Sequence, residues 1–364
     1  MINLNRRRFV QAAATTAIAA ALPLIHIRAA QAADPLKIGY IYVGPVNDGG
    51  WNTAHEAARQ EMMKALGDKV TSSYVENVAE GPDSERVIRD FANQGCGLIF
   101  ATSVGYMDAL MKVAKDFPDI KFEMCTGFKK APNVANYNIR FHEGRSVIGT
   151  LAGMLTKTNV GGYLATFPVP EVVSGINSFQ LAAQAVNPKF RTKVIWINTW
   201  FDPAKEADAA RALIDQGCDV MTQHTDSPAA VQLCETKGIP TFGQGADQSK
   251  FAPTMCKTST EDQWGPFYTT AAKDVLAGTW KAEDEYWGMK EGAIKMAPIS
   301  NVPDDVKAAG DKIIAGWMDG SYNVYTGPIK DQSGAVKVPE GKTMSDDEIL
   351  GLNWLVDGVD GKMS

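Results

Sequence analysis

Phe91-Ala-Asn-Gln-Gly-Cys-Gly-Leu-Ile-Phe100 and Leu213-Ile-Asp-Gln-Gly-Cys-Asp-Val-Met-Thr222 are two stretches of the chain with one pattern. Each reads as the end of a helix, a glycine that can cap it in a left-handed conformation, and a short buried strand. The match is short by itself. It nevertheless lies inside a longer alternation of strands and helices that occurs twice, so it favours two lobes of similar construction.

Short apolar strands alternate with amphipathic helices on both sides of a helix expected at 143–157. The expected strands are 36–43, 70–76, 97–102 and 121–125 before it, and 162–166, 193–198, 219–223 and 239–243 after it. Parallel strands need helical crossovers, and such sheets are covered on both faces. The sequence therefore predicts an α/β protein with two doubly wound parallel sheets.

The expected organisation assigns each part of the chain to a lobe. The first lobe takes 33–142 and about 258–285, and the second takes 143–257 and about 286–330. After the second array we expect a helix at about 261–277, a strand-like stretch at 286–299 and a helix at about 304–318. The Gly- and Asp-rich segment 331–364 is expected to wrap the lobes.

Residues 1–32 read as an export signal. Asn5-Arg-Arg-Arg-Phe-Val-Gln11 is followed by an apolar run at 12–25 and by Ala30-Gln-Ala32. This order of basic, apolar and small residues is typical of a signal peptide, and the paired arginines favour the twin-arginine type over an ordinary secretory signal. The apolar run is too short for a comfortable membrane span. We expect cleavage after Ala32, no lipid anchor, and a soluble periplasmic protein.

Composition narrows the class of partner. Hydrophobic residues make up 45% and charged residues 21% of the 364 residues, which are globular proportions. Without residues 1–32 the chain keeps 32 basic and 42 acidic side chains, a net charge of about −10. A chain this acidic is a poor binder of phosphate backbones, which excludes a general nucleic-acid binder. The expectation is a monomer.

Metal, cofactor and catalytic motifs are not found. The five cysteines form no C-x-x-C pair and have no histidine at zinc spacing, so we expect no metal site. We interpret most of these cysteines as small buried residues, and the sequence allows one disulfide without indicating its pairing. Ala101-Thr-Ser-Val-Gly105 is similar to a nucleophile elbow, in which Ser103 would be the nucleophile. Asp202 or Asp219, and then His224, follow it in the order that the acid and the histidine have in hydrolases with this motif. Strand ends in any parallel sheet carry small polar residues, so we favour no enzyme activity and no cofactor.

The loops that follow the strands carry aromatic and acidic residues. Gly44-Pro-Val-Asn-Asp-Gly-Gly-Trp-Asn52 comes after the first strand, and Thr199-Trp-Phe-Asp-Pro203 occurs in the second array. Two tryptophans facing each other across a cleft would hold a flat ring, while carboxylates and amides take its N–H groups. These loops contain no Arg or Lys, which disfavours a phosphorylated or carboxylate ligand. The candidate ligand-binding residues are Asp48, Trp51, Asn52, Phe167, Trp200, Asp202, Asp226 and Asp247.

The loops also carry a family resemblance. Asn47-Asp-Gly-Gly-Trp-Asn52, the run from Glu143-Gly to Leu151-Ala-Gly153, Trp200-Phe-Asp-Pro-Ala-Lys205 and Gly245-Ala-Asp-Gln248 resemble the basic membrane protein (BMP) family of PnrA-like substrate-binding proteins of ABC importers. The resemblance implies a type I periplasmic-binding-protein fold with three crossing segments. It also implies a purine stacked between Trp51 and Trp200, and an inner-membrane permease as partner.

The chain departs from the family pattern at three places. Gly245 stands where nucleoside-binding members often carry the Asp that holds ribose hydroxyls. Thr258-Ser-Thr-Glu-Asp-Gln-Trp264 lacks the Lys that often follows Thr-Ser, and Met124-Cys-Thr126 lacks a terminal Asp. Trp264 could add a further wall to the site or pack a helix.

We therefore predict an exported receptor that delivers a purine, a free base such as adenine or guanine, to an ABC-type importer. The alternatives are a purine nucleoside or sugar receptor, a sensor that presents its ligand to a signalling partner, and an exported hydrolase that uses Ser103.

Overall fold

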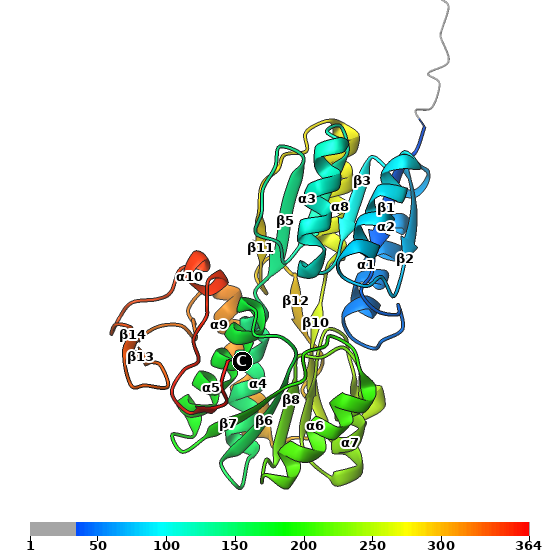
Figure 1. Cartoon of the computed structure of the whole chain (residues 1–364). Coiled ribbons are helices and arrows are strands. Elements are labelled where there is room, and N and C mark those ends of the chain that lie inside the picture. The colour runs from blue at the N-terminus through cyan, green and yellow to red at the C-terminus, as the bar shows by residue number, and fades with distance from the viewer. Residues whose placement is uncertain (1–33, 364) are drawn as a thin grey trace, which may run out of the picture. The chain divides into compact units, whose positions relative to one another are not determined.

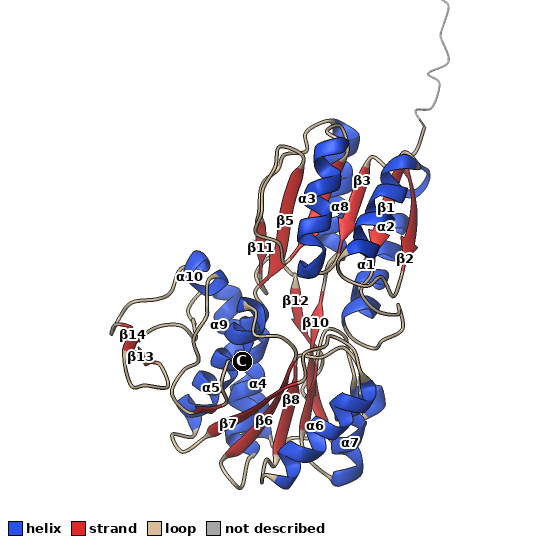
Figure 2. Cartoon of the chain, in the orientation of Figure 1, coloured by secondary structure: helices blue, strands red, loops and turns tan. Residues whose placement is uncertain are grey.

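The computed structural model describes residues 34–363, so the expected signal peptide lies outside the described residues. Two large sheets organise these residues, one of six strands and one of seven (Figures 1 and 2). No helix among residues 34–363 is long and apolar enough to cross a membrane.

The first sheet has the order β11-β5-β4-β3-β1-β2, and all its neighbouring strands run parallel. Its strands are β1 (Leu36–Ile41), β2 (Val70–Val75), β3 (Leu98–Ala101), β4 (Lys121–Cys125), β5 (Val134–Ile139) and β11 (Glu285–Trp287). Helices α1 (Trp51–Leu66) and α8 (Gly265–Ala277) cover one face, and α2 (Pro82–Asn93) and α3 (Met107–Asp116) cover the other. This sheet and these four helices are called the first lobe.

Alternation along the strands explains this layering. Leu98 and Phe100 of β3 belong to the core cluster under α1 and α8, whereas Ile99 and Ala101 belong to the cluster under α2 and α3. Successive side chains of a strand point to opposite faces, so a strand buried on both faces is apolar throughout.

The second sheet has the order β12-β10-β9-β8-β6-β7-β15. Its strands are β6 (Val160–Ala165), β7 (Arg191–Trp196), β8 (Val220–Gln223), β9 (Thr241–Gly243), β10 (Cys256–Asp262), β12 (Ile294–Met296) and β15 (Val359–Asp360), with β12 antiparallel to β10. Helices α4 (Phe141–Leu155) and α5 (Pro170–Val186) lie on one face, and α6 (Pro203–Asp215) and α7 (Ala229–Lys237) on the other. With α9 (Asp304–Asp319), which packs on α4, they form the second lobe.

The two stretches that favoured a duplicated architecture have the same backbone geometry. Gly95 and Gly217 adopt φ of +80° and +90°. The N–H of Cys96 donates to the carbonyl of Phe91 at 3.1 Å, and the N–H of Cys218 donates to that of Leu213 at 3.2 Å. Each glycine thus ends a helix in the left-handed region, which places the following strand at the same point of each lobe.

The chain passes between the sheets three times, after β5, after β10 and after β11. Residues 258–262, which the sequence assigns to the first lobe, belong to β10 of the second sheet, and α8 begins at Gly265 instead of about 261. The expected single stretch 286–299 is two short strands, β11 and β12, in different sheets. Strand β10 was not predicted from the sequence because most of its buried residues are polar, so the segment lacks the apolar pattern of a strand.

Strand β5 was not expected from the sequence. Asn136 and Asn138 interrupt its apolar run. Asn136 is buried, and its amide nitrogen donates to the carbonyl of Lys129 at 3.1 Å and to Asp284 Oδ1 at 3.0 Å. A buried amide with partners is stable inside a sheet, but its partners come from loops that the local sequence does not reveal.

The C-terminal residues pack on the second lobe. Strands β13 (Ile329–Lys330) and β14 (Val336–Val338) form a hairpin, α10 (Asp346–Leu350) follows, and β15 joins the edge of the second sheet beside β7. Asn177 of α5 anchors this segment, because its amide donates to the carbonyl of Trp354 at 2.9 Å and accepts from the N–H of Val356 at 3.0 Å.

All five cysteines are buried and free, so the disulfide left open by the sequence is not formed.

Candidate functional site

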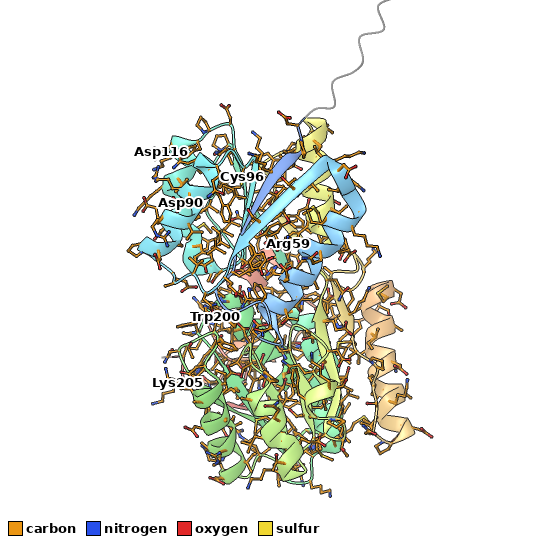
Figure 3. All side chains as sticks on the ribbon, turned by 90° about the vertical axis from the view of Figure 1, so that its right-hand side faces the viewer. Arg59, Asp90, Cys96, Asp116, Trp200 and Lys205 are labelled. Atoms are coloured by element: carbon orange, nitrogen blue, oxygen red, sulfur yellow. The ribbon has the colours of Figure 1, made fainter. Side chains whose placement is uncertain are left out.

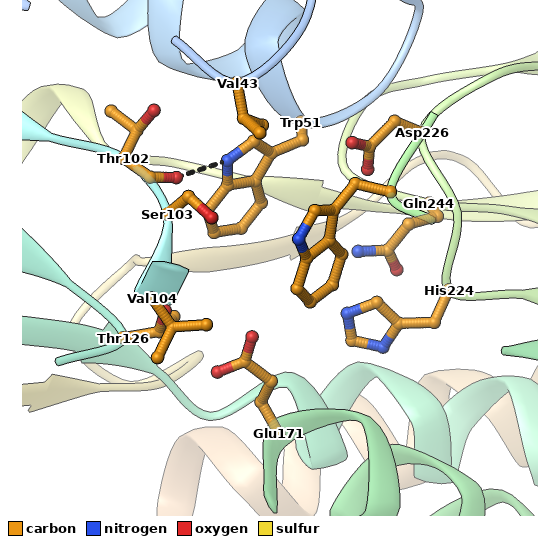
Figure 4. A pocket seen from close by; sticks show the side chains of 11 residues that line it. Val43, Trp51, Thr102, Ser103, Val104, Thr126, Glu171, His224, Asp226 and Gln244 are labelled. Atoms are coloured by element: carbon orange, nitrogen blue, oxygen red, sulfur yellow. Dashed lines mark hydrogen bonds between the residues drawn. The ribbon is translucent and has the colours of Figure 1, made fainter. Parts of the chain in front are cut away.

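A cavity between the two lobes collects residues from the carboxyl ends of the strands, where open parallel sheets bind their ligands (Figure 4). Its empty space is about 360 Å³, including solvent at its mouth. It is called the interlobe cavity and is lined by Val43, Trp51, Thr102, Ser103, Val104, Thr126, Glu171, Trp200, His224, Asp226 and Gln244.

Trp51 is the wall contributed by the first lobe. As the first residue of α1 it lies directly after the glycine-rich loop, and its Nε1 donates to the carbonyl of Thr102 at 2.8 Å. The rings of His55 and Trp264 pack edge-on against it, at centroid distances of 4.5 and 5.4 Å. These contacts fix the indole plane before any ligand arrives.

Trp200 is the wall contributed by the second lobe, from the loop after β7. It lies at the boundary between the lobes in the side view (Figure 3), and the ring of Phe167 packs against it at 5.0 Å. Its Nε1 donates to Glu80 Oε1 of the first lobe at 3.2 Å, and the same oxygen accepts from Ser103 Oγ at 2.6 Å. Phe167 therefore supports this wall, while Glu80 connects it to the opposite lobe.

Two carboxyl groups face the cavity. Glu171 is the second residue of α5, and burial raises its pKa to about 8. Asp226 is 5% exposed and its Oδ2 has no hydrogen-bond partner; burial and then the neighbouring carboxylates raise its pKa well above the ordinary value. An ionised carboxyl group can accept from a ligand N–H, and a protonated one can donate to a ring nitrogen, so both groups suit a ring that carries both.

The loop that presents Asp226 is held by a buried carboxylate of α6. Glu206 Oε2 accepts from Thr225 Oγ1 at 2.9 Å and from Ser227 Oγ at 2.6 Å. His224 of this loop is buried, its Nδ1 has no partner, and burial lowers its pKa well below the ordinary value. The neutral imidazole adds one donor and one acceptor to the site.

Gln244 adds an amide at the end of β9. The Arg145 guanidinium and Thr260 Oγ1, the latter at 3.2 Å, both donate to its Oε1. With its oxygen occupied, Gln244 presents the Nε2 amide as a donor to the cavity. Arg145 itself is fully buried behind Gln244 and is not among the lining residues.

Asp48 and Asn52, two of the sequence candidates, fix the start of α1 and do not line the interlobe cavity. Asp48 accepts from the backbone N–H groups of Gly50, Asn52 and Thr53 at 2.8–3.0 Å. The Asn52 amide donates to Asp48 Oδ2 at 2.8 Å. Both side chains thereby position Trp51 at the first turn of the helix.

Three further residues considered from the sequence lie outside the lining. Asp202 caps α6 by accepting from the N–H of Lys205 at 3.1 Å, and Asp247 accepts from the N–H of Ser249 at 2.9 Å. Trp264 is 1% exposed and packs behind Trp51. Trp51, Trp200 and Asp226 are therefore the candidates that the structure brings together in one cavity.

The loops of the two lobes touch at the glycines before α1. Gln248 Nε2 donates to the carbonyl of Gly49 at 3.0 Å. A Cβ added at Gly50 would lie 2.7 Å from the carbonyl oxygen of Asp226, and one added at Gly245 would lie 3.0 Å from the backbone carbon of Gly50. The lobes meet through bare backbone here, which explains why glycine occupies both positions.

Glu171 and Gln244 are not among the candidate ligand-binding residues predicted from the sequence. Glu171 lies four residues after the candidate Phe167, and Gln244 directly precedes the run Gly245–Gln248, so position near a strand end was the available signal. The sequence pointed to His224 as a possible hydrolase residue that would act on Ser103. In the structure the Ser103 hydroxyl donates to Glu80 and not to His224. Among residues 34–363 no group of three or more His, Cys, Asp or Glu is placed to hold a metal ion.

Comparisons with known proteins identify the family of the chain. The family described as ABC transporter substrate-binding protein PnrA-like matches residues 36–315. A purine-binding protein of Brucella abortus is 54% identical over 92% of this chain and 96% of its own. A protein of Haloferax volcanii, named as a candidate glucose-binding protein of an ABC transporter, is 37% identical over 79% of this chain and 74% of its own.

Solved structures show the same fold. An ABC transporter solute-binding protein from Conexibacter woesei aligns with a TM-score of 0.64 at 24% identity, over 79% of this chain and 98% of that one.

Proposed function

Because the chain belongs to the PnrA-like family of ABC transporter substrate-binding proteins, which bind solutes and are not enzymes, we propose that it is an exported purine receptor. In this proposal it binds a purine, a free base such as adenine or guanine, in the interlobe cavity. It then delivers the base from the periplasm to an ABC-type importer.

The observation that carries the proposal is the pairing of Trp51 and Trp200. They come from opposite lobes and line one cavity together with Glu171 and Asp226. Indole faces suit a flat ring, and the carboxyl groups, His224 and Gln244 supply donors and acceptors for its edge. None of the described lining residues is Lys or Arg, which disfavours a phosphorylated ligand.

Native mass spectrometry of protein purified from a periplasmic fraction tests the proposal directly, because a ligand retained on purification is identified by its mass. We expect the protein to carry a purine, either retained from the cell or bound after the retained ligand has been exchanged for an added purine. Retention of a hexose that purines do not displace would instead support the sugar alternative. The relative from Haloferax volcanii, which is named for glucose binding, is the reason to test it.

A free base is expected to bind at least about tenfold more tightly than its nucleoside, a difference of about 1.4 kcal/mol. The backbone of Gly50 and Trp51 packs against Gly245, so the ribose-binding Asp found at that position in other members is missing and has no room. Unpaired ribose hydroxyls in a closed cavity cost about 1–3 kcal/mol each. Calorimetric titration of adenine, guanine, adenosine and guanosine measures this, and tighter nucleoside binding would remove the free-base assignment only.

Glu80→Ala is expected to weaken purine binding about 2- to 10-fold, mainly through faster release. The substitution removes the acceptor that joins Ser103 to Trp200 across the lobes, and hydrogen bonds of this kind contribute about 0.5–1.5 kcal/mol each. Asp83→Ala is the matched control, because Asp83 is also an exposed acid of the first lobe but pairs with Arg86. Equal release rates in stopped-flow fluorescence for both variants would contradict the role of Glu80.

A further inference from the structure

A second pocket lies within the first lobe, where the loop after α8 returns to β11. Its empty space is about 680 Å³, including solvent at its mouth, and it shares no lining residue with the interlobe cavity. It is called the α8–β11 pocket. The lining residues that matter here are Glu123, Phe267, Asp274, Trp280, Glu285 and Trp287.

Glu123 forms the buried end of this pocket. Its side chain projects from β4 and is only 2% exposed. Its Oε1 accepts from Trp280 Nε1 at 2.7 Å, while its Oε2 has no hydrogen-bond partner. Burial raises the pKa of Glu123 to about 8. Ionising this buried group without a cation nearby is costly, so a positive partner would stabilise its ionised form.

The charges around Glu123 are mostly of its own sign. Asp274 of α8, Glu285 of β11 and Asp284 before it all oppose its ionisation. Lys281 and Glu283 also line the pocket, and Lys281 Nζ lies 3.7 Å from Glu283 Oε1. Lys130 Nζ lies 2.8 Å from Asp284 Oδ2, so both lysines already have acidic partners. The Lys281 side chain is 73% exposed, so it does not neutralise the buried end.

The walls of the pocket are aromatic. Trp287 and Phe267 pack edge to face at 5.6 Å, and Glu285 Oε2 accepts from Trp287 Nε1 at 2.7 Å. Lys121 Nζ already lies over the ring of Trp280, 5.4 Å from its centroid. Aromatic faces attract cations and also cover an alkyl chain, so these walls suit a ligand with both parts.

We propose that the α8–β11 pocket binds a small alkylammonium ion, with its N–H groups donating to Glu123 and its alkyl chain lying against Trp280 and Trp287. The described residues hold no set of His, Cys, Asp or Glu suited to a metal ion, and the tryptophan walls would leave a bare metal ion without ligands on those sides. An ammonium satisfies the unpartnered oxygen with a directed hydrogen bond, and a slender chain fills the aromatic part.

The test uses n-butylammonium chloride as the probe and 1-butanol as its neutral counterpart. The indole N–H signal of Trp280 is followed by ¹H–¹⁵N NMR of the full mature chain, because this group donates to Glu123. Trp280→Phe assigns the signal among the eight tryptophans. We expect saturable shifts with butylammonium and at least tenfold weaker binding of butanol. Equal binding of the two probes, or no saturation, would overturn the proposal.

Glu123→Gln is the decisive variant, because its amide oxygen can still accept from Trp280 Nε1 while the negative charge is lost. We expect butylammonium affinity to fall at least tenfold and purine affinity to stay within twofold of wild type. Unchanged butylammonium affinity in this variant would also overturn the proposal. If this variant fails to fold, Glu285→Gln at the half-buried rim takes its place, and we expect it to lower butylammonium affinity by about threefold. The comparison of butylammonium with butanol on the wild-type protein tests the proposal independently of either variant.

Discussion

Trp51→Ala and Trp200→Ala should each weaken purine binding by about 1–3 kcal/mol, which is about 5- to 150-fold. Each substitution removes one indole face from the interlobe cavity and leaves the other lobe's wall in place. Isothermal titration calorimetry with adenine and guanine measures the loss. Both residues start or precede a helix at a loop end, so we expect the melting temperature of the free protein to change less than the affinity.

The two variants differ in what else they disturb. Trp51 also packs on His55 and Trp264, whereas Trp200 packs on Phe167 at the cavity mouth. Trp200→Ala therefore disturbs fewer core contacts, although it also removes the hydrogen bond from Trp200 Nε1 to Glu80. Trp354→Ala is the control, because this half-buried tryptophan lies in the C-terminal segment and not in the cavity. Unchanged purine affinity together with a large fall in melting temperature would assign both tryptophans to the core and remove the proposed site.

Gly50→Ala should lower purine affinity by a comparable amount, about 5- to 150-fold, by opposing closure of the lobes. The added Cβ would lie 2.7 Å from the carbonyl oxygen of Asp226, which is backbone of the other lobe and cannot move aside as a flexible side chain could. Overpacking of this kind costs about 1–3 kcal/mol. The clash exists only where the lobes meet, so the open protein should keep its stability.

Small-angle scattering with and without adenine separates this mechanism from simple loss of contacts. Wild-type protein should become more compact at saturating ligand, and Gly50→Ala should need more ligand for the same change. Gly351→Ala is a control in the C-terminal segment, because the nearest atom to its added Cβ is at 3.3 Å and belongs to its own helix turn. Full compaction of Gly50→Ala at wild-type ligand concentrations would contradict the proposed steric block.

The doubled fold could be predicted from the sequence because its signals are local. The glycines at 95 and 217 each end a helix in the left-handed region, and the strands that follow, β3 and β8, are buried throughout and begin with apolar residues. Strands β5 and β10 were harder, since both contain buried polar residues. Their stability depends on partners far away in the chain, such as the Asp284 that binds Asn136.

The candidate site was predicted in part. The strand-end rule selected loops that contribute to the interlobe cavity, and three of its candidates, Trp51, Trp200 and Asp226, line that cavity. It could not distinguish a carboxylate that faces a ligand from one that caps a helix. Asp48 and Asp202 have the same loop context as Asp226, but their oxygens are used by the backbone N–H groups of α1 and α6.

The sequence by itself determined the number and class of the lobes, because glycine caps and strand alternation act within a few residues. Only the tertiary structure decided which side chains share the interlobe cavity. Glu171 and Gln244 belong there because β6, which leads into α5, and β9 end at the same edge of one sheet. Gln244 presents its Nε2 because buried Arg145 and Thr260 occupy its oxygen. Orientation of this kind depends on which partners are near in space, and residues 99 positions apart in the chain carry no local trace of it.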